Sequence, residues 1–209
     1  MTIERPRTLV IDTATAACSV ALIEGGRVID SRHEVVGRGH AERLVPMIAE
    51  LADGARAPHI LVDVGPGSFT GIRVGIAAAR GLALGWGAGI AGYSSTSLIA
   101  AAAIADGIAP PLAVVLEGGH GELFMQMFIA PLAPDGPLVS LPPAAALAAL
   151  GARPAVGSGV RWLAPLDASL ALHDALPDAT AAILLPDALA TLPARPLYGR
   201  APDAKLPAA

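Results

Sequence analysis

A glycine-rich loop at residues 65–71, with the sequence Gly-Pro-Gly-Ser-Phe-Thr-Gly, has residue types and spacing that could hold a phosphate. Backbone N–H groups point toward an anion where such a loop opens a helix. The loop is not a P-loop, because Ile72 stands where that motif requires a lysine. It resembles the dinucleotide-binding fingerprint with one extra residue, but no acidic residue ends the next strand to hold a ribose. Two interpretations stay open: an anion site built on Gly65, Gly67 and Ser68, and a turn that only allows close packing.

Asp12 and Thr13, which end the first apolar run, form a second candidate for phosphate chemistry. An aspartate in this place could hold a phosphate through magnesium and water, because hard cations prefer oxygen ligands. A complete site needs a second phosphate loop and a second carboxylate, and residues 157–159, Gly-Ser-Gly, are only a weak echo of such a loop. With a complete site the chain would be an ATP-dependent kinase or ATPase. The alternative is a strand-end carboxylate that makes local hydrogen bonds.

The histidines and the single cysteine do not form a recognisable metal site. Cys18 alone excludes an internal disulfide and a cysteine-rich zinc site. No two histidines stand three or four residues apart, so a helical metal site of the metallopeptidase kind is not expected. His120, between Glu117 and Glu122, is the best acid–base candidate by composition, and its alternative is the tip of a polar hairpin. The five histidines stand at positions 33, 40, 59, 120 and 173.

These residues must be positioned by alternating strands and helices. Apolar runs predict strands, and apolar residues at helical spacing predict helices. This order predicts an α/β fold in which helices pack on mixed or parallel sheets. From 131 to 193 the periodicity is weak, and no elements are predicted. The expected order is strands at 8–12, 18–23 and 27–33, a helix at 39–51, a strand at 60–64, a helix capped by Ser68 or Thr70, a strand at 89–93, a helix capped by Ser94 or Ser95 and ending near 105, and strands at 112–116 and 123–129.

The two predicted helices before residue 86 carry distinct apolar faces. The earlier one has Leu44, Met47, Ile48 and Leu51 on one face, and Pro46 should kink it or mark its effective start. The later one has a core-facing stripe and a second stripe nearly bare of side chain, where another helix could approach closely. The core-facing stripe is Phe69, Ile72, Ile76, Ala79 and Ala83, and the small stripe is Gly71, Gly75, Ala78 and Leu82.

Composition bounds the class of protein. With 209 residues, 54% of them hydrophobic and 15% charged, the chain can bury a substantial core. A net charge of −4 and 3% aromatic residues supply no basic footprint for binding nucleic acid alone. The apolar run at 97–105 is too short to span a bilayer and no signal-peptide pattern opens the chain, so we expect a cytoplasmic protein without a membrane partner. Turn residues near 106–111 predict lobes at 1–107 and 108–209, and the last residues could pack back on the first lobe.

Three segments resemble the TsaB (YeaZ) family of bacterial proteins. They are IDTATAACSVALIEGGRVI, GHAERLVPMI and GPGSFTGIRVGIAAARGLAL, and the resemblance covers roughly residues 8–128. Near the end, Leu197-Tyr198-Gly199-Arg200 after Pro196 looks like the family's closing proline-x-tyrosine-x-arginine segment. Family members belong to the machinery that makes threonylcarbamoyladenosine at position 37 of tRNAs that read ANN codons.

The resemblance implies an actin-like, hexokinase-like (ASKHA) fold of two lobes and a scaffold without its own catalysis. Its partner would be TsaD, the enzyme that carries the metal-binding histidines and transfers threonylcarbamoyl to tRNA. The ATPase TsaE would join them, while TsaC makes the threonylcarbamoyl-adenylate. We therefore expect no cofactor in this chain itself, ATP and magnesium only at the level of the complex, and tRNA contact only through the complex. An older name for such proteins, M22 glycopeptidase, would need the missing metal site.

The resemblance also assigns a partner surface. In the family the helices that carry HAERLVPMI and SFTGIRVGIAAARGLAL form a bundle with a partner subunit, either TsaD or, in isolation, a second copy. Small residues would admit the partner's helix and larger apolar ones would anchor it. The alternative is that these helices pack only on this chain's own sheet. The interface residues expected are His40, Arg43, Leu44, Met47, Leu51, Gly71, Arg73, Gly75, Ala78 and Leu82.

One segment departs from the family pattern. The family usually has Asp-Ala-Arg-x-x-Glu after the first strand of the second lobe, whereas residues 117–122 here read Glu-Gly-Gly-His-Gly-Glu. The arginine is lost, which puts in doubt any role of that residue in contacting a partner or a nucleotide.

Overall fold

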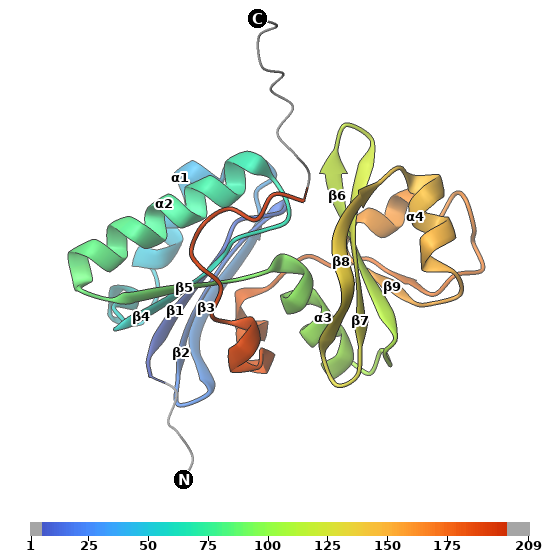
Figure 1. The fold of residues 1–209 in the computed structure, drawn as a ribbon. Helices are drawn as coiled ribbons and strands as arrows, with labels where there is room; N and C mark the ends of the chain where they lie inside the picture. The colour runs from blue at the N-terminus through green and yellow to red at the C-terminus, as the bar shows by residue number, and fades with distance from the viewer. Residues whose placement is uncertain (1–5, 200–209) are drawn as a thin grey trace, which may run out of the picture.

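Two five-stranded sheets, one in each lobe, form the frame of the protein (Figure 1). The computed structural model describes residues 6–199. The first sheet has the order β3-β2-β1-β4-β5 and the second the order β10-β9-β6-β7-β8. The first contains β1 (Thr8–Asp12), β2 (Ala17–Glu24), β3 (Arg27–Val35), β4 (His59–Asp63) and β5 (Gly89–Tyr93). The second contains β6 (Leu112–Gly119), β7 (Glu122–Ile129), β8 (Ala133–Leu141), β9 (Ala155–Val156) and β10 (Leu172–His173).

The first sheet is mixed. Strands β1, β2 and β3 pair antiparallel, while β4 lies parallel to both β1 and β5. The turn between β2 and β3 is made by Gly25 and Gly26, whose φ values of 56° and 75° suit residues without a Cβ. Because parallel neighbours end at the same edge, Asp12 and Asp63 at the ends of β1 and β4 come close together.

Helices cover both faces of the first sheet (Figure 1). α1 (His40–Ala49) and α2 (Phe69–Trp86) share a core with one face, and α3 (Ser95–Ala105) with the other. Of the predicted N-caps, Ser68 and Ser94 are the ones that accept a backbone N–H, from Gly71 and Ser97. No helix within residues 6–199 is long and apolar enough to cross a membrane.

The structure removes one of the two alternatives for Pro46 and corrects the position of Phe69. Pro46 lies in the interior of α1, which already begins at His40, so proline does not mark the start of the helix. Phe69 does not face the core, because it is the first residue of α2 and 54% of its surface is exposed. The other members of the predicted core stripe are buried, as expected: Ile72, Ile76, Ala79 and Ala83.

The second lobe contains elements where the sequence predicted none. β8 pairs with β7, and α4 (Pro143–Leu150) covers the sheet through Ala146 and Leu150. Short 3-10 turns complete the chain, and residues 179–199 return to the first lobe. There the amide of Ala179 donates to Ser19 Oγ at 2.9 Å. The 3-10 turns are η1 (Ala52–Ala55), η2 (Ser158–Trp162), η3 (Ala179–Leu184) and η4 (Asp187–Leu189).

Candidate functional site: the interlobe cleft and the helical face

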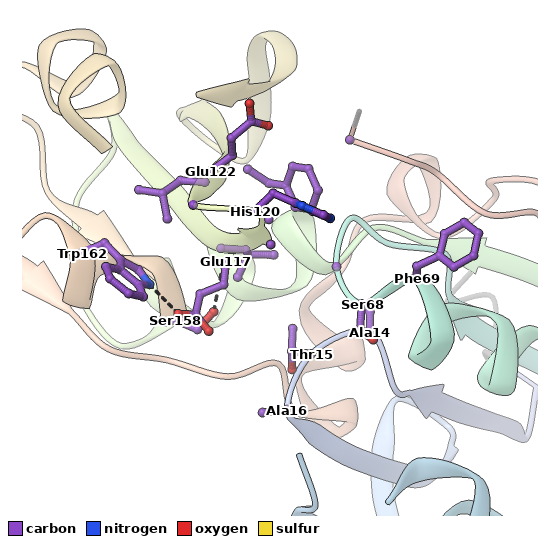
Figure 2. A pocket seen from close by; sticks show the side chains of 18 of the residues that line it. Ala14, Thr15, Ala16, Ser68, Phe69, Glu117, His120, Glu122, Ser158 and Trp162 are labelled. Atoms are coloured by element: carbon purple, nitrogen blue, oxygen red, sulfur yellow. Dashed lines mark hydrogen bonds between the residues drawn. The ribbon is translucent and has the colours of Figure 1, made fainter. Parts of the chain in front are cut away.

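A cleft of about 980 Å³ lies between the lobes (Figure 2). The first lobe lines it with the loop after β1, the β3–α1 loop and the start of α2. The second lobe contributes the hairpin between β6 and β7, with Ser158 and Trp162 from η2. Tyr198 and Gly199 at the end of the described chain complete the wall. Clefts of this size commonly hold small molecules.

The polar groups on the second-lobe wall are held by their neighbours. Glu117 accepts hydrogen bonds from Trp162 Nε1 at 2.5 Å and from Arg161 Nε at 2.7 Å. His120 sits at the tip of the β6–β7 hairpin with φ of 53°, and its ring projects into the cleft on the side of Phe69 (Figure 2). Of the two interpretations of this loop, the tip of a polar hairpin is the one that matches its position between β6 and β7.

Asp12 does not reach the cleft. Its side chain is fully buried, where it accepts hydrogen bonds from Tyr93 Oη at 2.9 Å and from the amide of Ala14 at 3.3 Å. Beside it, Asp63 accepts from Ser95 Oγ and from the amide of Gly65, each at 2.6 Å. The second carboxylate that a phosphate site would need is thus present, but both carboxyls are sealed beneath the cleft.

Burial controls the ionisation of this carboxyl pair. Loss of solvation raises the pKa of Asp12, and it raises the pKa of Asp63 well above its usual range with help from the charge of Asp12. The two carboxyls also hydrogen-bond to each other, which requires a proton on one of them. Burial and the charge of Asp12 raise the pKa of Asp63 the more strongly of the two, so Asp63 is the member that keeps the proton. Desolvation and both carboxyls likewise raise the pKa of Tyr93 well above its ordinary value.

The glycine loop is a close-packing turn rather than an open anion cradle. The amide of Ser68 donates to the carbonyl of Ala14 at 2.6 Å, and that of Gly71 donates to Ser68 Oγ at 3.2 Å. A Cβ on Gly67 would overlap the carbonyl of Ala14. Thr13 Oγ1 is also used inside the chain, donating to the carbonyl of Gly71 at 2.8 Å. Together with the Gly65 amide on Asp63, these contacts take up the amides of Gly65 and Ser68 and the hydroxyl of Thr13, which the sequence assigned to a phosphate.

Most of the residues predicted to meet a partner are buried within this chain. The side chains of Leu44, Met47 and Leu51 are at most 3% exposed, so they cannot anchor a partner. Gly71 and Gly75 face the end of β1, where an added Cβ would overlap the carbonyl or Oγ1 of Thr13. The close approach that these glycines permit is therefore to this chain's own strand, and the prediction of a partner's helix there is wrong.

The remaining predicted interface residues are divided between core and surface. His40 is buried with Nε2 3.0 Å from the carbonyl of Ala17, while Ala78 and Leu82 are half-buried against the core of the first lobe. Arg43 forms a two-pronged ion pair with Glu34 across α1 and β3. Of the ten residues, Arg73 is the one that is exposed.

A different face of α1 and α2 is exposed, and the sequence analysis missed it. Val45 on α1 and Leu84 on α2 expose 60% and 88% of their surfaces. Between them on α2, Ala77, Gly81 and Gly85 recur every four residues on the outer side, and a Cβ on either glycine would meet nothing within 4 Å. This second stripe of small residues has the four-residue spacing that also separates Gly71 and Gly75, and it is the feature of the sequence from which this exposed face could have been predicted. We call the set Val45, Pro46, Ala49, Ala77, Gly81, Leu84 and Gly85 the outer helical face.

The residues that hold metals in proteins do not gather in the described part of the chain. Within residues 6–199, no three His, Cys, Asp or Glu side chains form a group that could hold a metal ion.

Two mixed-sheet lobes with helices packed on them and a cleft between them form the two-lobed α/β architecture that was predicted as an actin-like, hexokinase-like (ASKHA) fold. The structure of YeaZ from Pseudomonas aeruginosa superposes with a TM-score of 0.79 at 29% identity, covering 93% of this chain and 100% of that one. The family model for TsaD, tRNA N6-adenosine threonylcarbamoyltransferase, matches residues 27–129.

Sequence relatives agree with this fold match. The chain is 37% identical over 125 residues to the tRNA threonylcarbamoyladenosine biosynthesis protein TsaB of Escherichia coli, covering 56% of this chain and 53% of that protein. It is 33% identical over 155 residues to an uncharacterized protein of Mycobacterium tuberculosis, covering 69% of this chain and 71% of that protein. The chain thus spans about half the length of the E. coli relative. It belongs to the TsaB (YeaZ) family.

Proposed function

We propose that this protein is a non-catalytic subunit of the cytoplasmic machinery that forms threonylcarbamoyladenosine at position 37 of tRNAs that read ANN codons. In this proposal it pairs with TsaD and activates it, TsaE joins the pair, and ATP and magnesium enter only with the complex. One contrast carries the proposal. The carboxyls suited to chemistry are sealed in the core, whereas an apolar helical face lies open to solvent.

The outer helical face has the chemistry of a helix-docking surface. Alanine and glycine at 77, 81 and 85 leave α2 without side chains that would hold a second helix away. Val45 and Leu84 are the large exposed aliphatic side chains of this face, and exposed aliphatic groups in such a patch commonly mark protein contacts. A second copy of the chain could use the same face around a two-fold axis, so we propose a homodimer when TsaD is absent.

A kinase or ATPase of the same fold is the weaker alternative. It would need Asp12 to hold magnesium beside a phosphate, and the Asp12 carboxyl is fully buried and already bound to Tyr93. Magnesium-dependent nucleotide binding by the isolated chain that is lost in Asp12→Asn would restore this alternative.

Light scattering after size-exclusion chromatography, with TsaD from the same organism, tests the proposal. Leu84→Arg places a charge in the centre of the outer helical face, and Leu166→Arg makes the same change at an exposed leucine of the second lobe. We expect Leu84→Arg to weaken pairing about tenfold or more and Leu166→Arg to leave it unchanged. No complex with the wild-type chain, with or without ATP, would remove the proposal. Equal affinities of both variants would remove the assignment of the face.

A further inference from the structure

The last described residues form a strap across the first lobe. Leu192 pairs with Gly92 through backbone hydrogen bonds of 2.6 and 2.9 Å, and the amide of Leu197 donates to the carbonyl of Val64 at 2.7 Å. Gly65 leaves room for this strap, because a Cβ there would lie 2.7 Å from the carbonyl oxygen of Leu197. The glycine loop is therefore explained in part by a segment that passes over it and delivers Tyr198 to the start of α2.

Tyr198 joins an exposed cluster of aromatic and arginine side chains. Its ring stacks on that of Phe69 with centroids 5.2 Å apart. The guanidinium of Arg73 lies 3.5 Å from the centroid of the Phe69 ring, and Arg73 Nε donates to Tyr198 Oη at 3.2 Å. Phe69 and Tyr198 still expose 54% and 40% of their surfaces at the rim of the cleft. Ordered aromatic surface in solvent is suited to stacking on another planar group.

Positive charge is concentrated on the same surface. Arg80 of α2 donates to the carbonyl of Ala194 in the strap at 2.8 Å and remains exposed, and Arg195 of the strap is exposed as well. Neither α2 nor residues 192–199 contain an acidic residue, although the whole chain has a net charge of −4. The acidic side chains nearest across the cleft, Glu117 and Glu122, belong to the opposite wall (Figure 2). We call Phe69, Arg73, Arg80, Arg195 and Tyr198 the basic aromatic surface.

We propose that the basic aromatic surface binds RNA directly, at a segment with unpaired bases. Arginines attract the phosphate backbone, and exposed rings stack on unpaired bases, which is the combination that single-stranded nucleic acid requires. The choice of RNA among polyanions rests on the proposed function in tRNA modification. This chain then holds part of the tRNA itself, in contrast to the expectation that tRNA is met only through partner subunits.

The basic aromatic surface adjoins the outer helical face, because Arg73, Ala77, Arg80 and Leu84 recur at three- or four-residue spacing along one side of α2. Arg73 and Arg80 lie seven residues apart, on the flank of α2 that adjoins the strap. Ala77 and Gly81 lie on the part of α2 that faces away from the sheet. RNA bound along the strap side would therefore lie beside a protein docked on the outer side, and measuring TsaD pairing of the same variants separates the two contacts.

Fluorescence anisotropy with a labelled RNA hairpin carrying an unpaired loop tests the proposal on the full chain, alone and mixed with TsaD, at ~50 and ~200 mM salt. The test variant is Arg73→Glu with Arg80→Glu. The matched control, Arg27→Glu with Arg56→Glu, makes the same change in charge at two exposed arginines. These lie at the start of β3 and just before β4, whereas α2 follows the opposite end of β4. Heparin serves as a polyanion without bases, and Phe69→Leu tests stacking. Circular dichroism verifies that each variant is folded.

We expect the test variant to lose about tenfold or more in RNA affinity and to show a salt dependence shallower by about 1.4 in log–log slope, from two lost phosphate contacts. The control variant should bind RNA as the wild type does. Phe69→Leu should weaken RNA binding by about fivefold or more and leave heparin binding unchanged.

Four outcomes separate this proposal from the proposed function. Equal RNA affinities of the test and control variants would overturn the proposal that the basic aromatic surface binds RNA. The proposal also falls if the chain alone does not bind RNA and adding it to TsaD does not increase RNA binding. If the test variant loses TsaD pairing but keeps RNA affinity, the surface contacts protein and the RNA proposal falls while the proposed function stands. RNA binding through this surface by a chain that does not pair with TsaD would support the RNA proposal and refute the proposed function.

Discussion

The buried pair of Asp12 and Asp63 should make the stability of the protein fall as the pH rises. Burial raises the pKa of both carboxyls, that of Asp63 well above its usual range. In the unfolded chain an aspartic acid has a pKa of about 3.9. Above that pH the folded protein therefore binds a proton that the unfolded chain has released. The stability associated with this proton is present at low pH and is lost as the pH rises to the folded pKa of the pair.

The size of the effect follows from the number of protons. A difference of one proton lowers the free energy of unfolding by about 1.4 kcal/mol for each pH unit within the pH window in which the folded pair keeps a proton that the unfolded chain has released. The exposed carboxyls of Asp30, Glu34 and Asp167 have pKa values lowered by their hydrogen-bond partners. Their contribution has the opposite sign and is lost only as the pH falls through the acidic range, outside this window.

Asp63→Asn is the perturbation that isolates the pair. The Gly65 amide and Ser95 Oγ donate to different oxygens of Asp63. An asparagine carbonyl can therefore keep the contact with the Gly65 amide, while its amide group donates to Asp12 in place of the proton and to Ser95 Oγ, whose hydroxyl can donate to the carbonyl of Pro66. We expect the variant to match the wild type near pH 5, to have a shallower pH dependence, and to be the more stable protein near pH 8. Urea denaturation at one-unit pH steps measures this, with exposed Asp106→Asn as the control. A wild-type stability that is flat or rises across the window, or an unchanged slope in Asp63→Asn, would refute the reasoning.

Two further changes test the packing of α2. Gly71→Ala should prevent folding or lower the melting temperature severely, because its Cβ would overlap the carbonyl of Thr13. Gly81→Ala on the open side should instead stabilise the protein by about 1 kcal/mol through helix propensity. Equal effects of the two substitutions in thermal denaturation would contradict the assignment of the two glycine stripes. Ser68→Ala removes the N-cap acceptor of the Gly71 amide and should cost about 1 kcal/mol, while Ser68→Asp, which keeps an acceptor, should retain wild-type stability in the same denaturation assay.

The sequence alone was enough for features that depend on neighbours along the chain. Apolar runs and helical spacing located all five strands of the first sheet and the three helices packed on it, and the caps at Ser68 and Ser94 were among the residues predicted. These features are local because a helix or strand buries one face, and the spacing of apolar residues records that face. The second lobe has this pattern in β6 and β7 but lacks it afterwards, since alanine, leucine and proline from 131 to 193 carry little alternation and β8 and α4 are held by β7.

The tertiary structure alone decided which surfaces of α2 are open. The buried stripe with Gly71 and the exposed stripe with Gly81 have nearly the same composition, so the pattern does not say which one faces β1. Asp12 and Asp63 each end an apolar run, but only the parallel register of β1 and β4 joins them and seals them from the cleft. Tyr198 likewise meets Phe69 because the strap returns across the lobe. Contacts between distant segments depend on how whole elements pack, which spacing along one segment does not encode.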